Sequence, residues 1–166
     1  MSEMKMLQSR RVLARLLKAV AIFMGGALLL AGLGPVNWFA QYIVGIEPAL
    51  AAFAPKAVIY VNLGFGPVYG ALFLAWQVFD AIGRDESFSY ANGKRLKGAA
   101  VLALMEVVWL AIGFGWFSHE GAISPFGLIA FVGLMLLGLS VAIICYALAQ
   151  LIDQAAALKE EADLTV

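Results

Sequence analysis

Glu106 is the residue of this sequence that most clearly suggests chemistry, because it lies inside a long apolar stretch between Met105 and Val107. A charged side chain at such a depth costs roughly 2.5 to 3.5 kcal/mol, so Glu106 must face a cavity, be protonated or be paired. Asn62 and Gln77, in the preceding apolar stretch, are the expected neighbours. One hypothesis is an intramembrane polar site for a proton or cation at Glu106, Asn62 and Gln77.

The second hypothesis for Glu106 is structural. A protonated carboxyl group that hydrogen-bonds between two helices would fix their packing without any transport role. We favour this hypothesis because no second acidic residue shares the depth of Glu106 in the sequence.

Catalytic and metal-binding groups are scarce in the rest of the chain. His119 is the single histidine and stands beside Glu120, whereas Cys145 is the single cysteine and lies in an apolar run. A metal site needs several convergent ligands, and a catalytic nucleophile needs an adjacent base. We therefore expect no enzymatic activity, no catalytic residue, no metal site and no cofactor.

The composition indicates which elements position these residues. Of the 166 residues, 63% are hydrophobic and 13% are charged, and the mean hydropathy is +0.91. Soluble domains are typically about 45–50% apolar and about 25% charged, so this chain is expected to be an integral membrane protein. The formal net charge of zero argues against direct nucleic-acid binding.

Four apolar stretches reach the ~20 residues that a membrane-spanning helix needs. They predict an all-α four-helix bundle in a single transmembrane domain, residues 1–166, with spans at about 13–33, 58–80, 98–117 and 126–152. We interpret the first stretch as a retained helix because no small-x-small cleavage site follows it before Trp38.

The connection after the first span has its own pattern. Trp38 and Tyr42 are aromatic residues of the kind found at a membrane–water boundary, and apolar residues recur there at helical spacing. We expect residues 36–46 to form a short interfacial helix in the first outer loop.

The basic residues are distributed asymmetrically about the predicted spans. Ten of the eleven Lys and Arg residues precede or open the first span, fall between the second and third spans, or lie in the tail, and only Lys56 falls on the other side. The positive-inside rule assigns the side rich in Lys and Arg to the cytoplasm. We therefore predict that both termini are cytoplasmic.

Two segments on this predicted inner side carry polar patterns. The loop 83–97 combines Phe88 and Asn92 with the basic residues Arg95 and Lys97, and the tail 156–166 is acidic. Loop and tail are expected either to clasp each other near anionic lipid or to offer a docking surface to a cytoplasmic protein.

These two segments resemble bacterial four-helix membrane proteins of the domain-of-unknown-function family numbered 2975. The resemblance rests on Phe88, Asn92 and Arg95-Leu96 in the loop, and on Glu161 followed by Asp163-Leu164-Thr165 in the tail. Ala162 departs from the pattern, since a polar residue is more common there.

The resemblance implies a multi-pass protein of the bacterial cytoplasmic (inner) membrane without established enzymatic activity. It also implies a non-enzymatic regulatory or scaffold component that binds a cytoplasmic partner such as a small helix-turn-helix regulator. The candidate docking residues are Phe88, Asn92, Arg95, Glu161, Asp163 and Leu164. The alternative function is a small proton- or cation-coupled transporter or channel centred on Glu106. Gly66 and Gly70 form a small-xxx-small pair that suits packing within one chain or in a homo-oligomer.

Overall fold

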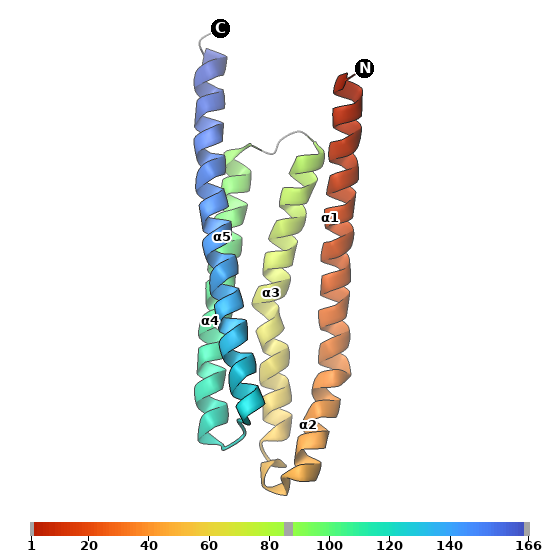
Figure 1. Ribbon diagram of the computed structural model, residues 1–166, viewed down its shortest axis with the longest axis vertical. Coiled ribbons are helices and arrows are strands. Elements are labelled where there is room, and N and C mark those ends of the chain that lie inside the picture. The colour runs from red at the N-terminus through yellow and green to blue at the C-terminus, as the bar shows by residue number, and fades with distance from the viewer. Residues whose placement is uncertain (1, 85–87, 165–166) are drawn as a thin grey trace.

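The computed structural model describes residues 2–84 and 88–164, with side chains over residues 12–84 and 88–162. All regular structure in these ranges is helical (Figure 1). The elements are α1 (Ser2–Leu33), α2 (Pro35–Ile46), the 3-10 helix η1 (Pro48–Leu50), α3 (Ala54–Gly83), α4 (Tyr90–His119) and α5 (Pro125–Leu164).

Four segments in the described part of the chain are long and apolar enough to cross a membrane. They are Val12–Ile46, Ala54–Gly83, Tyr90–His119 and Pro125–Ala162. The predicted all-α architecture with four spans is therefore confirmed.

The first and last helices are longer than a membrane span requires. With a rise of about 1.5 Å per residue, the 32 residues of α1 and the 40 residues of α5 extend about 48 Å and 60 Å. Both project beyond the end of α3 and the start of α4 (Figure 1). We call this end of the bundle, where α1 begins and α5 ends, the terminal end, and the opposite end the far end.

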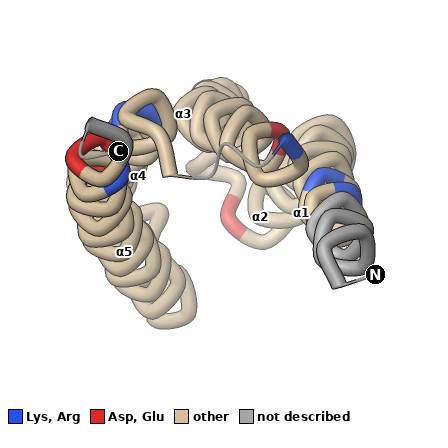
Figure 2. The backbone as a smooth tube through the Cα atoms, turned by 90° about the horizontal axis from the view of Figure 1, so that it is seen from above, with Lys and Arg blue, Asp and Glu red and all other residues tan. Residues whose placement is uncertain are grey.

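The helices form an open bundle rather than a closed one. Viewed from the terminal end, α1, α3, α4 and α5 follow one another in a curved row, with α1 and α5 at its two extremes (Figure 2). Each helix packs against its neighbour in the row, and the α4–α5 interface is the most extensive.

Small residues explain the close α4–α5 packing. Ala142, Ala149 and Ala156 are seven residues apart on one face of α5, and their side chains are only 2%, 0% and 7% exposed. Large apolar residues such as Phe126 point outward, at 79% exposed. This distribution is typical of membrane bundles, in which small residues let helices approach closely and large ones face lipid.

A helix does form in the connection after the first predicted span, as expected. Pro35 occupies the first turn of α2, directly after Gly34, and the rings of Trp38 and Tyr42 stack with centroids 5.7 Å apart. In Figure 1, α2 continues α1 obliquely at the far end. Its aromatic residues are exposed, as suits side chains at a membrane boundary.

Candidate functional site

Charged residues of α1, α3, α4 and α5 lie near the terminal end (Figure 2). We call the following nine residues the terminal-end network: Lys18, Trp76, Gln77, Asp80, Arg84, Asn92, Arg95, Lys97 and Asp153. All three ion pairs between described side chains belong to it.

Asp80 is the centre of the first part of this network. Its carboxylate accepts hydrogen bonds from the Nζ of Lys18 on α1 and from the guanidinium of Arg84, one turn later on α3. The Nζ of Lys18 also lies 5.1 Å from the centre of the Trp76 ring, within cation–π range. One carboxylate thus joins α1 to α3 and is balanced by two cations.

Arg95 on α4 is held differently, by neutral partners. Its Nε donates to Oε1 of Gln77 on α3 at 3.0 Å, and its Nη1 donates to Oδ1 of Asn92 at 2.7 Å. Asn92 is fully buried. Among the described side chains, no carboxylate lies within ion-pair distance of Arg95. Two amide oxygens therefore position this guanidinium without neutralising it.

The start of α4 explains the position of Asn92. Ser89 is the N-cap residue, with extended backbone, and its carbonyl accepts hydrogen bonds from the amides of Asn92 and Gly93. Asn92 therefore lies inside the first turn and turns its side chain toward Arg95. Its amide oxygen accepts a hydrogen bond from Arg95, about one turn later on the same helix.

The α4–α5 side of the network is an ion pair over a glycine. Nζ of Lys97 lies 2.7 Å from Oδ2 of Asp153, and Gly93 is buried directly beneath the same carboxylate. A Cβ atom at Gly93 would lie only 2.0 Å from Oδ1 of Asp153. Any larger residue at Gly93 would therefore displace this ion pair. Sequence reasoning did not connect Asp153 with Lys97, since 56 residues separate them.

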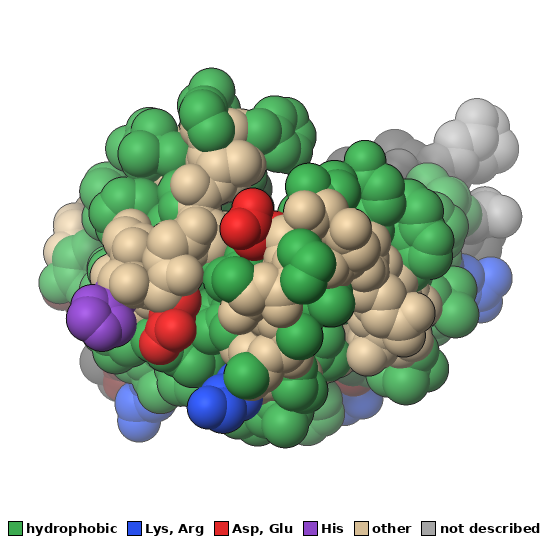
Figure 3. Space-filling model, turned by 90° about the horizontal axis from the view of Figure 1, so that it is seen from below, with side chains coloured by type: hydrophobic (Ala, Val, Ile, Leu, Met, Phe, Trp, Pro, Cys, Tyr) green, Lys and Arg blue, Asp and Glu red, His purple; other side chains and the backbone are tan. Residues whose placement is uncertain are grey.

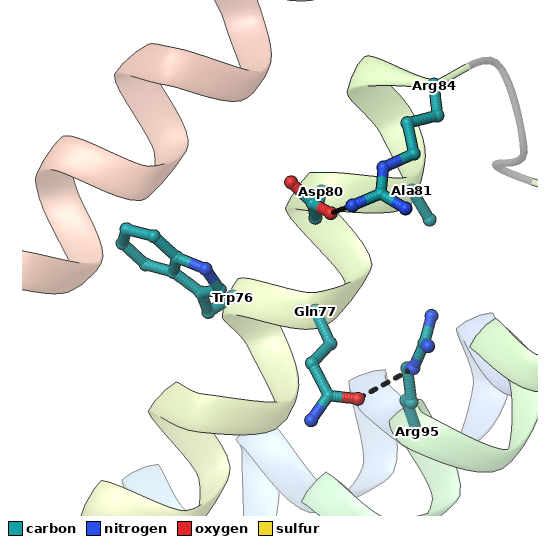
Figure 4. Close-up of a pocket in the computed structure, with 6 residues that line it drawn as sticks. All are labelled: Trp76, Gln77, Asp80, Ala81, Arg84 and Arg95. Carbon is teal, nitrogen blue, oxygen red and sulfur yellow. Dashed lines mark hydrogen bonds and ion pairs between the residues drawn. The ribbon is translucent and has the colours of Figure 1, made fainter.

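A cavity of about 350 Å³ opens within the network (Figure 4). Its described lining residues are Trp76, Gln77, Asp80, Ala81, Arg84 and Arg95. Figure 4 shows the guanidinium groups of Arg84, on α3, and Arg95, on α4, on facing sides of this space. The cavity is therefore a polar space with two forked cationic donors.

The middle of α3 and α4 contains a second, very different cluster, which we call the mid-helix cluster: Tyr60, Gly64, Glu106, Trp109 and Gly113. The rings of Tyr60 and Trp109 stack with centroids 4.4 Å apart, and the Tyr60 hydroxyl donates to the Trp109 carbonyl. Oε2 of Glu106 and Nε1 of Trp109 are buried without a hydrogen-bond partner among the described residues.

The three residues of the predicted intramembrane site do not come together. Asn62 donates to the carbonyl of Val58 and faces Gly32 of α1. Gln77 belongs to the terminal-end network and, fifteen residues further along α3, lies about 22 Å from Asn62 along the helix. Glu106 instead faces Gly64 and shares its surroundings with Trp109.

The predicted docking residues also divide into two groups. Phe88 is 62% exposed and Glu161 is exposed, whereas Asn92 and Arg95 face into the network. The side chains of Asp163 and Leu164 lie outside the described residues.

The far end offers no comparable grouping. Figure 3 shows mainly hydrophobic and uncharged surface there, with the single histidine beside an acidic side chain and few other charged groups. The described residues contain no cluster of three or more His, Cys, Asp or Glu side chains suited to a metal ion.

Comparisons with known proteins agree with this picture of a membrane protein. The sequence model of the family described as "Protein of unknown function (DUF2975)" matches residues 38–166. The chain is also 27% identical over 152 residues to the "Uncharacterized membrane protein YoaS" of Bacillus subtilis (strain 168), covering 90% of this chain and 95% of that protein. No solved structure matches.

Proposed function

Since the chain belongs to the DUF2975 family of proteins of unknown function, we propose a function from its own geometry. The protein is a non-enzymatic regulatory or scaffold component of the membrane, and it holds a cytoplasmic protein at its terminal end. The observation that carries this proposal is the concentration of the described ionic network at that end, below two projecting helices. A rigid, charged platform suits recognition of a water-soluble partner.

Exposed apolar residues at the terminal end add contact area for a partner. Phe88 and Tyr90 at the start of α4 are 62% and 47% exposed, and Leu158 near the end of α5 is 66% exposed. Large apolar side chains next to charged ones are typical of protein-binding patches. Because Asn92 and Arg95 are occupied inside the network, the proposed docking surface rests on Phe88, Leu158 and Glu161.

The partner that the family resemblance suggests is a small helix-turn-helix regulator, held at the membrane and away from DNA. Fold and family by themselves do not establish such a role, so the proposal depends on finding that partner directly. No enzymatic step is part of this proposal.

The proposal requires the terminal end to be cytoplasmic, and the basic residues support that orientation. Single-cysteine variants in a Cys145→Ala background test it. Ser118→Cys, at the far end, should react with a membrane-impermeant maleimide added to intact cells. Ser89→Cys, at the terminal end, should react only after the membrane is opened. The reverse labelling pattern would contradict the orientation and the cytoplasmic partner together.

The partner itself is tested by photocrosslinking in native membranes. A photoreactive residue at position 88 should capture one dominant soluble protein, and truncation after Lys159 should abolish this crosslink. The matched control is a photoreactive residue at Phe126, which is also exposed but lies at the far end. Crosslinks from position 88 to lipid or to the protein's own tail alone would refute docking and favour a structural clasp.

The alternative function, a small proton- or cation-coupled transporter, is favoured by one observation. Oε2 of Glu106 is buried without a hydrogen-bond partner among the described residues, as a carboxyl that binds and releases a proton would be. A flux in proteoliposomes that is lost in Glu106→Gln would support transport. Equal flux in both proteins, or no flux in either, would refute it.

A further inference from the structure

We propose that the cavity between α3 and α4 at the terminal end is a binding site for a phosphate group, with Arg95 and Arg84 as its cationic donors. The cavity has a volume of about 350 Å³, near the lower limit for small-molecule pockets. Four of its six described lining residues are polar or charged, which suits a small anion better than an apolar ligand.

Arg95 is the strongest argument for an anionic occupant. Gln77 and Asn92 hold its guanidinium through Nε and Nη1 at 3.0 and 2.7 Å. Both partners are uncharged amides, and no described carboxylate pairs with Arg95. The positive charge is therefore fixed in place beside the cavity without a described carboxylate partner, which is the preorganisation that an anion site needs.

Asp80, the single carboxylate among the described lining residues, does not neutralise the positive charge beside the cavity. Asp80 is paired with both Lys18 and Arg84. Among the described side chains, the three cations Lys18, Arg84 and Arg95 therefore outnumber the one carboxylate, Asp80, by two. Arg84, whose side chain is 69% exposed, has room to turn a free edge of its guanidinium toward a ligand.

The geometry favours phosphate over other anions. Two guanidinium groups from different helices face each other across the cavity (Figure 4). A guanidinium is a planar fork that binds phosphate oxygens in pairs, so two such forks match a tetrahedral group with several oxygens. This phosphate has two sources: the headgroup of an anionic phospholipid or free inorganic phosphate.

The test measures ligand-dependent stabilisation of the purified full-length protein in a neutral detergent. Phosphatidylglycerol, phosphatidylcholine and inorganic phosphate are titrated separately, with chloride at matched ionic strength as the salt control. The rise in Tm with concentration gives an apparent Kd for each. Lipid headgroup binding predicts a rise with phosphatidylglycerol well above that with phosphatidylcholine, whereas free phosphate binding predicts a rise with the inorganic ion.

Lys94 supplies the matched control for Arg95. It is the preceding residue on α4 and carries the same charge, but it is exposed and lies outside the six described residues that line the cavity. Arg95→Gln should weaken binding roughly tenfold or more, because hydrogen bonds to charged groups contribute about 1.5–3 kcal/mol. Lys94→Gln should bind almost as the unaltered protein does.

Two further variants keep the test decisive if Arg95→Gln fails to fold. Arg84→Gln removes the exposed fork, and Arg95→Lys retains the charge while losing the paired donors; both should weaken binding. Equal losses in the Arg95 and Lys94 variants would reduce the effect to general surface charge and overturn the proposal. The proposal would also be overturned if neither phosphatidylglycerol nor inorganic phosphate raised the Tm of the protein. The test does not involve the proposed protein partner, so each proposal can fail without the other.

Discussion

The terminal-end network and the mid-helix cluster each contain a carboxyl group, but they surround it in opposite ways. At the terminal end, Asp80 is paired with two cations and Arg95 is held by two amides. In the middle of α4, Glu106 and Trp109 each leave a buried polar atom without a described partner. Water and lipid headgroups are within reach of helix ends, where charges can be assembled in sets, whereas the apolar interior supplies no such partners.

The two regions also differ in what holds them rigid. The terminal-end contacts are mainly ionic, and the side chains of Arg84 and Lys97 are 69% and 47% exposed. The mid-helix contacts are aromatic and close-packed: the Tyr60 ring lies against Trp109 and over the bare backbone of Gly113. Stability should therefore be more sensitive to shape in the middle of the helices and more sensitive to salt at the terminal end.

The largest effect that this comparison predicts is for Gly113→Ala. A Cβ atom there would lie 2.7 Å from Cε1 of Tyr60, whose ring cannot move aside because it stacks on Trp109 and donates to its carbonyl. Overpacking of this kind costs about 1–3 kcal/mol in free energy of unfolding. Unfolding in mixed detergent micelles measures the loss.

Gly115→Ala is the matched control for this change. Gly115 lies two residues away on α4 and is exposed, and none of the described atoms would lie within 4 Å of a methyl group added there. Alanine at this position should be neutral, or should stabilise α4 by up to about 1 kcal/mol through helix propensity. Equal behaviour of the two variants would show that the aromatic stack is not a rigid element.

Glu106→Leu is expected to have a smaller effect, in the direction of higher stability. Since Oε2 has no described hydrogen-bond partner, leucine removes a buried polar group without leaving another group unpaired. We expect a gain of about 1 kcal/mol in free energy of unfolding, near the lower end of such costs because Glu106 is only partly buried. A loss of stability would instead show that Glu106 makes a structural hydrogen bond. The mid-helix cluster would then resemble the terminal-end network in having paired polar groups.

The sequence predicted the spans better than the sites, and the reason is physical. Apolar length determines where a helix crosses the membrane, so α3 and α4 enclose the predicted 58–80 and 98–117. A helix that is apolar on nearly all sides carries little information about its rotation. Gln77 and Glu106 were therefore placed in one site, although Gln77 contacts Arg95 at the terminal end.

Other parts of the network were hidden by sequence distance. Lys18 and Asp80 are 62 residues apart, and their pairing depends on α1 lying beside α3 in the row. The small residues contained a usable signal: the seven-residue spacing of Ala142, Ala149 and Ala156 marks the α5 face that packs on α4. That spacing would have placed Asp153 on the same face, and so near α4.

The smallest predicted effect is for Asp80→Asn, and its salt dependence matters more than its size. Asparagine keeps the shape of Asp80 but cannot balance Lys18 and Arg84, so α1 and α3 lose an ionic link. Because the pair is partly solvated, the loss in Tm should be modest and should shrink as ionic strength rises. Glu106→Gln should show no such salt dependence, since the mid-helix cluster is removed from mobile ions. A loss for Asp80→Asn that persists at high salt would mean that Asp80 acts mainly through packing, and the contrast between an ionic end and a close-packed middle would no longer hold.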